Sequence, residues 1–384
     1  MSPDVSMDLI PNEDQRALRD SIERLLADHY GTAQRTAYAR QPEGWSRALW
    51  ARLAELGLLG LTVPPDHGGS GLGAAEVMVA AEALGHALVL EPWMSTAIIG
   101  TAALQLAGSE AQRAQWLPRI AEGAVTIAWA PGSPAMPGAL PNVETTAPAG
   151  AQGWLLEGAQ ALVMHGDSAD RLLVSAKLAD GSLALFLVAA SSPGLSREAI
   201  TLQDGRRAAH LRMEKVPVLA QDRLGMADAA PVIEHLCDIA VACVCAEAVG
   251  VLQEMLDLTV AYIKTRQQFG VPIGSFQALQ HRAVDMLVQV DAARSMALYA
   301  AGMVMEPDAL ERRRAMAAAK VQIGRSARFV GQQAVQLHGG MGMSMETKVA
   351  RCFLRSTAIE HQFGGTEAHL QLLARLGGLI SPQE

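Results

Sequence analysis

The order of helical and β-type segments constrains the fold of this 384-residue chain more than any single motif does. Residues 12–122 have helical periodicity, residues 123–225 contain short β-type runs, and long helical segments return from residue 227. This order predicts an α+β fold. We expect a helical domain over residues 1–122, an antiparallel β-domain over 123–225 and a second helical domain over 226–384.

Several boundaries can be predicted within these regions. Asn12 and Gln15 form a predicted capping box at the start of the first helix. The segment Thr62–Gly73 is too rich in proline and glycine for regular structure, and helical periodicity then runs from Ala74 to about Gly108. The predicted strands include TIAWA, GWLLEG, RLLVSAK and LALFLVAA, and the predicted long helices cover about 229–265, 275–305 and 309–338.

Composition excludes several classes of protein. Half of the residues are hydrophobic but only 4% are aromatic, which favours helices packed on helices. The net charge is −8 and the basic residues are scattered, so we expect no nucleic-acid partner. The four cysteines have no metal-binding spacing, which fits a reducing cytoplasm. We see no signal peptide and no stretch of 18 uncharged apolar residues, so we expect no membrane partner.

One carboxylate, Glu247, is the only charged side chain in the apolar run Ile239–Leu252. Burying an unpaired carboxylate costs several kcal/mol, roughly, so a chain seldom keeps one without a reason. Burial of a carboxyl group also raises its pKa, which suits a base that removes a proton near neutral pH. The alternative is a helical Glu that points to water or bonds a neighbouring backbone group.

Two segments of the last helical region have features of a nucleotide site. The first, Arg266–Met286 (RQQFGVPIGSFQALQHRAVDM), combines an arginine that can meet phosphates with an aromatic residue that can cover a flat ring. The second, Gln336–Met343 (QLHGGMGM), has paired glycines that let backbone N–H groups approach a phosphate or ribose. Each segment alone is also compatible with a plain turn between helices.

With these segments the chain resembles the acyl-CoA dehydrogenase family over nearly its whole length. Within it the stretches LLADHY, PEGWSRALW, LVLEP, HGDSAD and KTRQQFG…IGSFQ are similar to small subunits of bacterial pimeloyl-CoA dehydrogenases. The resemblance implies an N-terminal helical domain, a β-barrel and a C-terminal four-helix bundle that together bind FAD. It also implies that Arg266 meets the FAD pyrophosphate, in a neighbouring subunit. The other residues implied to lie along the dinucleotide are Gln268, Phe269, Gln336, Gly339, Gly340 and Thr366.

The chain departs from the family at the catalytic base. The Tyr–Glu–Gly–Thr stretch that carries the usual base is Phe363–Gly364–Gly365–Thr366 here, and the position of a second family base is occupied by Ala240. Glu247 lies seven residues after Ala240, on nearly the same face of the helix. Some heteromeric relatives carry a Glu in this position, so the resemblance makes Glu247 the candidate base.

Further departures affect the β-domain and the substrate site. The Trp–Ile–Thr of the family is Leu162–Val163–Met164 here, and its Thr–Glu–Pro turn is replaced by Pro131–Gly132–Ser133. Asp238 aligns with a position that touches CoA, although a cap or a solvent-facing residue is an equal alternative. Gly364 keeps the main-chain N–H that in the family hydrogen-bonds the thioester oxygen of the substrate.

The leading hypothesis is an FAD-dependent acyl-CoA dehydrogenase in which Glu247 takes the α-proton while a β-hydride passes to flavin N5. Electrons would then pass to an electron-transfer flavoprotein. Family members form tetramers through the C-terminal helices, so we expect a homotetramer or a heterotetramer with a large acyl-CoA dehydrogenase subunit. Two alternatives stay open: a non-catalytic subunit that completes the FAD or CoA site of a partner, and an acyl-CoA oxidase.

Overall fold

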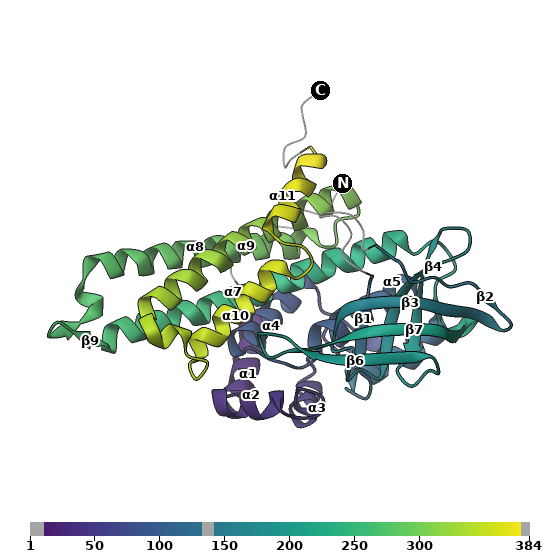
Figure 1. The fold of residues 1–384 in the computed structure, drawn as a ribbon, viewed down its shortest axis with the longest axis horizontal. Coiled ribbons are helices and arrows are strands. Elements are labelled where there is room, and N and C mark those ends of the chain that lie inside the picture. Colours follow the sequence, from purple (N-terminus) through teal and green to yellow (C-terminus); the bar gives the residue numbers. More distant parts are fainter. Residues whose placement is uncertain (1–10, 133–141, 378–384) are drawn as a thin grey trace. The chain divides into compact units, whose positions relative to one another are not determined.

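The structure is a computed structural model and describes residues 11–132 and 142–377 (Figure 1). Helices come first, strands second and helices again last, so the predicted α+β order is confirmed. The chain forms two compact units. One contains the residues up to Gly31, Ala74–Val89 and the chain from Val241 onward; the other contains Thr32–Gly73 and Leu90–Ala240. The division into domains at residues 122 and 225 stays a prediction.

The first helices begin where the sequence places them. Helix α1 (Glu13–His29) starts with the capping box that Asn12 and Gln15 form, as predicted. The segment Thr62–Gly73 is irregular apart from one short turn of 3-10 helix, η1. The remaining elements of this part are α2 (Thr32–Ala39), α3 (Arg47–Glu55), η1 (Pro65–His67), α4 (Ala74–Ala87), η2 (Met94–Gly100), α5 (Thr101–Ala107) and α6 (Glu110–Ala121).

The continuous helical segment predicted from Ala74 to Gly108 was wrong in its middle. Helix α4 ends at Ala87, and the chain resumes as a π-helical turn, η2, at Met94. Leu88 adopts a left-handed conformation with φ 60°, and Pro92 has no N–H to continue a helical ladder. These two residues account for the break.

The strands form two four-stranded sheets. All four predicted runs are strands, and the domain contains further strands, including β6 and the long β7. One sheet has the order β1-β4-β5-β8 and the other β2-β3-β7-β6. Strands β1 and β4 pair in parallel, so the expectation of a wholly antiparallel domain was wrong there. The bounds are β1 (Ile127–Ala130), β2 (Ala149–Gly150), β3 (Gly153–Met164), β4 (Arg171–Lys177), β5 (Leu183–Ala189), β6 (Leu195–Thr201), β7 (Arg207–Leu219), η3 (Ala220–Asp222) and β8 (Arg223–Leu224).

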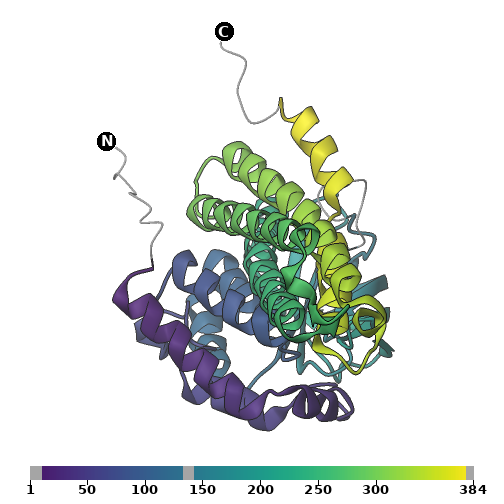
Figure 2. The same ribbon diagram turned by 90° about the vertical axis from the view of Figure 1, so that its left-hand side faces the viewer.

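Long helices dominate the rest of the chain (Figure 2). Helix α9 packs against both α8 and α10, and all three belong to the same compact unit. The bounds are α7 (Ala230–Thr265), β9 (Gln267–Gln268), β10 (Val271–Pro272), η4 (Ile273–Ser275), α8 (Gln277–Met303), α9 (Ala309–His338), η5 (Gly339–Met343), α10 (Lys348–His361) and α11 (Thr366–Arg375).

Helix α7 contains the apolar run around Glu247. By length and composition alone it could cross a membrane, but 78% of its most apolar window is buried inside the protein, which is the pattern of a core helix. Two glycines explain how closely it packs on α4. A Cβ at Gly85 of α4 would lie 2.2 Å from the carbonyl oxygen of Glu247, and a Cβ at Gly250 would lie 1.9 Å from that of Glu82. Backbone therefore packs on backbone, and the segment that carries Glu247 cannot move closer to α4.

Candidate functional site

Glu247 is buried and ion-paired. Its side chain points toward α10, where Arg355 donates from Nε to Oε1 and from Nη2 to Oε2, each at 2.8 Å. Arg355 is itself only 2% exposed and also donates to Oε1 of Gln362 at 3.0 Å. Such a two-pronged arginine contact stabilises the ionised carboxylate and fixes its orientation. The alternative of a Glu that points to water is therefore wrong.

Arg355 was missed from the sequence, although a signal was present. It lies on a face of α10 whose other members, Cys352, Ser356 and Ile359, are all buried. An arginine on the buried face of a short helix requires an anion, since an unpaired buried charge is strongly unfavourable. Glu247 is 108 residues away in the sequence, so the partner could not be assigned without the fold.

The segment with the usual family base forms a clamped turn between α10 and α11. Phe363 and Gly364 both have positive φ, 59° and 99°. The N–H of Gly364 donates to the carbonyl of His361 at 3.2 Å, at the long end of the hydrogen-bond range. A Cβ at Gly364 would lie 2.9 Å from Nε2 of His369, so this turn is built without a side chain at that position.

The RQQFG segment forms a small exposed hairpin. Strands β9 and β10 pair Gln268 with Val271, and both residues of the turn, Phe269 and Gly270, have positive φ. That turn geometry favours asparagine or glycine, and a bulky residue in it is strained. Phe269 is nevertheless 90% exposed and touches Phe276 edge-on. Arg266 and Gln268 are exposed on the same hairpin, so all three candidate cofactor residues face outward.

The QLHGG segment lies beside the end of α7. The ring of His338 stacks on Tyr262 with centroids 4.5 Å apart, and Tyr262 is four residues before Arg266. The two segments that the sequence singled out are therefore neighbours in space. Burial lowers the pKa of His338, whose Nδ1 bonds the carbonyl of Ala334, so this histidine stabilises the turn. Gln336, Gly339 and Gly340 are exposed beside it.

The β-sheet residues supply little polar chemistry at the family's flavin position. Leu162 is exposed with φ 54°, Val163 is buried, and Met164 is partly buried, so this segment offers no side-chain hydroxyl or N–H. Pro131 and Gly132 follow β1, whereas Ser133 lies outside the described residues. Asp238 is 5% exposed and lies inside α7, so the interpretations as a cap or a solvent-facing residue were wrong.

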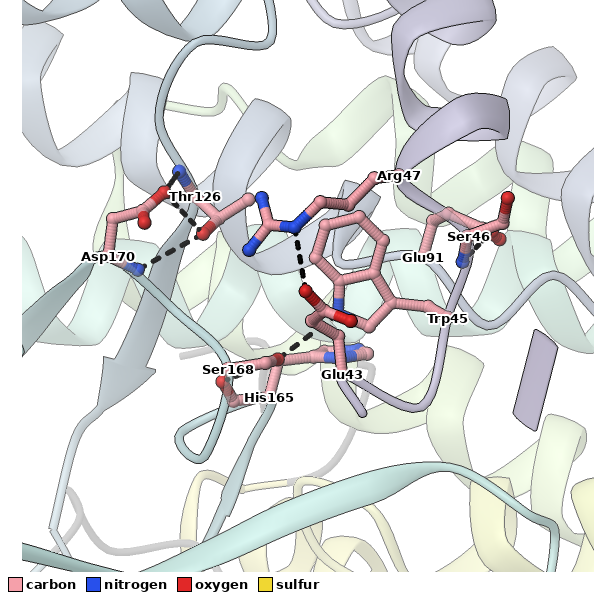
Figure 3. A network of polar contacts seen from close by, with 9 residues as sticks. All are labelled: Glu43, Trp45, Ser46, Arg47, Glu91, Thr126, His165, Ser168 and Asp170. Atoms are coloured by element: carbon pink, nitrogen blue, oxygen red, sulfur yellow. Dashed lines mark hydrogen bonds and ion pairs between the residues drawn. The ribbon is translucent and has the colours of Figure 1, made fainter. Parts of the chain in front are cut away.

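Figure 3 shows a polar network that joins three of the segments on which the resemblance rests. Trp45 donates from Nε1 to Oγ of Ser168 at 3.1 Å, and the N–H of Ser46 donates to Oε1 of Glu91 at 3.0 Å. In the same network Thr126 donates twice to Oδ2 of Asp170, at 2.8 and 2.9 Å. The stretches PEGWSRALW, LVLEP and HGDSAD are thereby held together, which accounts for them structurally.

His165 and Asp167 belong to the turn of HGDSAD. The N–H groups of Gly166 and Ser168 donate to the carbonyls of Val163 and His165, as in a tight turn. Burial raises the pKa of Asp167, which forms an ion pair with Arg207 at 2.7 Å. These contacts account for both residues as parts of a hydrogen-bonded turn.

Comparison with known proteins places the chain. The family model described as "Acyl-CoA dehydrogenase, N-terminal domain" matches residues 12–124, and the one described as "Acyl-CoA dehydrogenase, C-terminal domain" matches residues 232–377. The acyl-CoA dehydrogenase FadE27 of Mycobacterium tuberculosis is 30% identical over 338 residues, which cover 86% of this chain and 88% of FadE27. The chain belongs to the acyl-CoA dehydrogenase family. It is therefore an FAD-dependent oxidoreductase of acyl-CoA thioesters.

Solved structures that resemble this chain share its fold. The ChsE4–ChsE5 complex from Mycobacterium tuberculosis contains a chain with a TM-score of 0.87 and 28% identity, covering 96% of this chain and 98% of that one. A structure described as the FAD complex of PigA has a TM-score of 0.85 and 25% identity, covering 96% of this chain and 99% of that one. Helices, central sheets and C-terminal helices are confirmed as the family's architecture.

Three features of the C-terminal helical part of the chain are compatible with bound FAD. A Cβ at Gly340 would meet nothing within 4 Å, and its φ is not positive, so the chain's own packing does not require glycine there. Phe269, whose backbone has a strained positive φ, exposes its aromatic ring on the hairpin that follows Arg266. The hydroxyl of Thr366 is buried without a hydrogen-bond partner among the described residues, as expected where a bound group supplies one. By resemblance Arg266, Phe269 and Thr366 would hold the dinucleotide, and this assignment stays a prediction.

Proposed function

We propose that this chain is one subunit of a heteromeric acyl-CoA dehydrogenase and that Glu247 is the base that removes the α-proton of the thioester. The observation that supports this most is the buried carboxylate of Glu247, which two hydrogen bonds from Arg355 fix on helix α7. The two other family positions for a base hold Ala240 and Gly364, neither of which can accept a proton.

The chemistry follows from the state of this carboxylate. A base must be deprotonated before it reacts, and the Arg355 contact keeps Glu247 in that form and orientation. FAD, when bound, accepts the hydride that leaves Cβ. Negative charge develops on the thioester oxygen as the α-proton leaves, and we infer from the resemblance that the N–H of Gly364 stabilises it. For this the N–H must share or exchange its long hydrogen bond to His361.

A second candidate is a structural subunit that completes the FAD or CoA site of a partner. It is favoured by Leu162 and Met164, which give the β-domain no hydrogen-bonding side chain where the family contacts the flavin. The tight Arg355 contact also serves a purely structural role. The ChsE4–ChsE5 complex shows that relatives of this fold assemble as unlike chains. An acyl-CoA oxidase stays a third alternative, distinguished by production of hydrogen peroxide.

The partners follow as further proposals. Helix α8 exposes an apolar stripe, Val284, Leu287 and Val288, at the helical spacing of one face. This stripe supports assembly through the C-terminal helices, as a homotetramer or with a larger subunit. Similarity to pimeloyl-CoA dehydrogenases suggests a medium-chain dicarboxylic or ring-derived acyl group, and an electron-transfer flavoprotein would take the electrons. We place the enzyme in the cytoplasm.

The test is the variant Glu247→Gln, made in the chain co-expressed with any genome-adjacent large subunit. We expect FAD to stay bound while bleaching of the flavin by CoA thioesters is lost, because the amide cannot take the α-proton. The matched control is Glu254→Gln, another buried acid of α7 that is ion-paired with His86 and Lys348. Bleaching retained by Glu247→Gln would exclude Glu247 as the base and leave the structural subunit as the better interpretation.

A further inference from the structure

Lys320 of α9 is a fully buried lysine whose ammonium binds only backbone carbonyls in the contacts that the structure describes. It is 0% exposed and donates from Nζ to the carbonyls of Ile359, Glu360 and Gly364, each at 2.9 Å. Three donors meet three acceptors, which is the full donor capacity of an ammonium group. A buried charge is strongly unfavourable unless its hydrogen bonds are satisfied in this way, so Lys320 depends on these three carbonyls.

The three carbonyls belong to one structural unit. Ile359 and Glu360 are in the last turn of α10, where carbonyls have no partner within the helix. Gly364 is in the turn that follows, which we call the α10–α11 turn (Gln362–Gly365). Lys320 therefore ties the end of the helix to the turn.

A second buried side chain also holds this turn. His369 of α11 contacts the carbonyl of Phe363 through Nε2 at 2.9 Å and is 7% exposed. Burial lowers the pKa of His369 to about 4, so the ring is neutral and Nε2 carries the proton that it donates. The two consecutive positive φ values of Phe363 and Gly364 are thus held by a side chain at each carbonyl. Strained backbone persists only where its surroundings determine it in this way.

We propose that Lys320 is a positioning residue for the reaction: it orients the peptide groups of the α10–α11 turn so that the N–H of Gly364 can hydrogen-bond the thioester carbonyl of the substrate. This inference rests on the proposed function, since it assumes the Gly364 contact. Lys320 does not touch the substrate itself. It acts through the carbonyls it binds, and loss of its donors would let the turn relax away from its strained conformation.

The charge of Lys320 makes its contact with the α10–α11 turn sensitive to pH. Burial lowers the pKa of the Lys320 ammonium to about 8. The titratable and charged groups that face it are Cys245 of α7, Arg355 and Glu360 of α10, and His369 of α11. Burial raises the pKa of Cys245 to about 12, and His369 is neutral well below pH 7, so neither changes charge near pH 8. Above pH 8 the neutral amine keeps two N–H donors for three carbonyls and loses its charge.

The experiment compares two ligands that differ only in the thioester carbonyl: octanoyl-CoA and the thioether S-octyl-CoA. Their affinities for the FAD-loaded protein are measured anaerobically by calorimetry in the Glu247→Gln background, so that no turnover occurs. The ratio of the two affinities reports the carbonyl contact, while effects on the CoA moiety cancel. Wild-type Lys320 should favour the thioester by about two- to tenfold, the range of one net hydrogen bond.

The variant is Lys320→Met, and the matched control is Lys177→Met, an exposed lysine of β4. We expect the preference for the thioester to fall to about one in Lys320→Met while the affinity of the thioether is unchanged. A merely structural role would lower both affinities together. If folded Lys320→Met still prefers the thioester, the inference about Lys320 is wrong but the Gly364 contact stands. If the protein with Lys320 intact shows no preference for the thioester, the Gly364 contact is wrong, and the inference falls with it.

The unsubstituted lysine provides a second test if Lys320→Met does not fold. The ratio of affinities is measured from pH 6.5 to 9.5 with Lys320 in place. We expect it to be constant below pH 8 and to fall above it, while the thioether affinity stays level. A ratio that is constant across the whole range overturns the inference.

Discussion

The Glu247–Arg355 pair gives the sharpest prediction about stability. Removing either partner leaves the other as an uncompensated buried charge, which typically costs about 3–5 kcal/mol. The geometry agrees with that range, since two charge-assisted hydrogen bonds of 2.8 Å are lost and each contributes about 1.5–3 kcal/mol. We therefore expect Glu247→Leu and Arg355→Met each to lower the free energy of unfolding by about 3–5 kcal/mol.

The double variant separates pairing from packing. Replacing both partners with apolar side chains of similar volume removes both buried charges at once and is often neutral. Only the contact from Arg355 to Gln362 is then lost without compensation, at about 1 kcal/mol. The double variant should therefore be about 2–4 kcal/mol more stable than either single variant. The coupling energy, which is the sum of the two single losses minus the loss in the double variant, should amount to about 5–9 kcal/mol, above the usual range for neighbouring residues.

The loss of stability depends more on the burial of the ion pair than on the distance between its charged atoms, and an exposed pair in the same chain provides a control. Arg47 and Glu43 are also 2.8 Å apart, but their side chains are 57% and 25% exposed (Figure 3). Arg47→Met should cost no more than about 0.5 kcal/mol. The assay is urea unfolding followed by circular dichroism at one fixed protein concentration, because assembly shifts apparent stability. Additive losses in the double variant, or an equal loss in Arg47→Met, would refute the reasoning.

Three further predictions test the backbone and one acid. Gly364→Glu, added to Glu247→Gln, should not restore flavin bleaching and should lower the melting temperature. The reason is that the new Cβ would lie 2.9 Å from Nε2 of His369, on a residue whose φ is 99°. Recovery of bleaching would contradict this prediction. Gly340→Ala should leave the melting temperature unchanged yet weaken FAD retention on gel filtration, since the chain leaves open space there; equal FAD retention would show that the cofactor does not approach it. Burial raises the pKa of Glu254, but hydrogen bonds and charge from His86 and Lys348 outweigh it and hold the pKa below the ordinary value of 4.5. The stabilisation that Glu254 contributes is therefore complete above pH 4.5 and is lost as the pH falls further. The difference in melting temperature between wild type and Glu254→Gln should accordingly become smaller in acid. A constant difference down to pH 3 would contradict this prediction.

Local rules predicted much of the fold because they act over a few residues. The capping box at Asn12 and the bounds of α9 follow from hydrogen-bonding side chains and apolar spacing, and both are confirmed. The break after Ala87 was missed because the residues on both sides of it, 78–85 and 88–93, are buried, so no exposed polar face shows where the helical period stops. The parallel pairing of β1 with β4 was missed because it joins strands about 40 residues apart.

The candidate site divides in the same way. The exposed hairpin around Phe269 and the glycines after His338 could be found from their sequence, because turn residues and glycines indicate the local backbone geometry. Arg355 and Lys320 could not, since each is meaningful only through a partner at least 39 residues away. A buried cation in an apolar helix face shows that an anion or a set of carbonyls is needed, but not which one.

The Arg355 contact also bears on how Glu247 could act as a base at all. Taking up a proton neutralises Glu247 and would leave Arg355 as an unpaired buried charge, a penalty of about 3–5 kcal/mol if nothing replaced the lost anion. In this reaction, however, the negative charge does not disappear, because it moves to the thioester oxygen as the α-proton leaves. The penalty is therefore smallest if that oxygen lies within the field of Arg355 and Lys320, both of which contact the segment around the α10–α11 turn. A base in an ion pair is thus compatible with catalysis only when the enolate forms beside the same cations, and this ties the role of Glu247 to the position of Gly364.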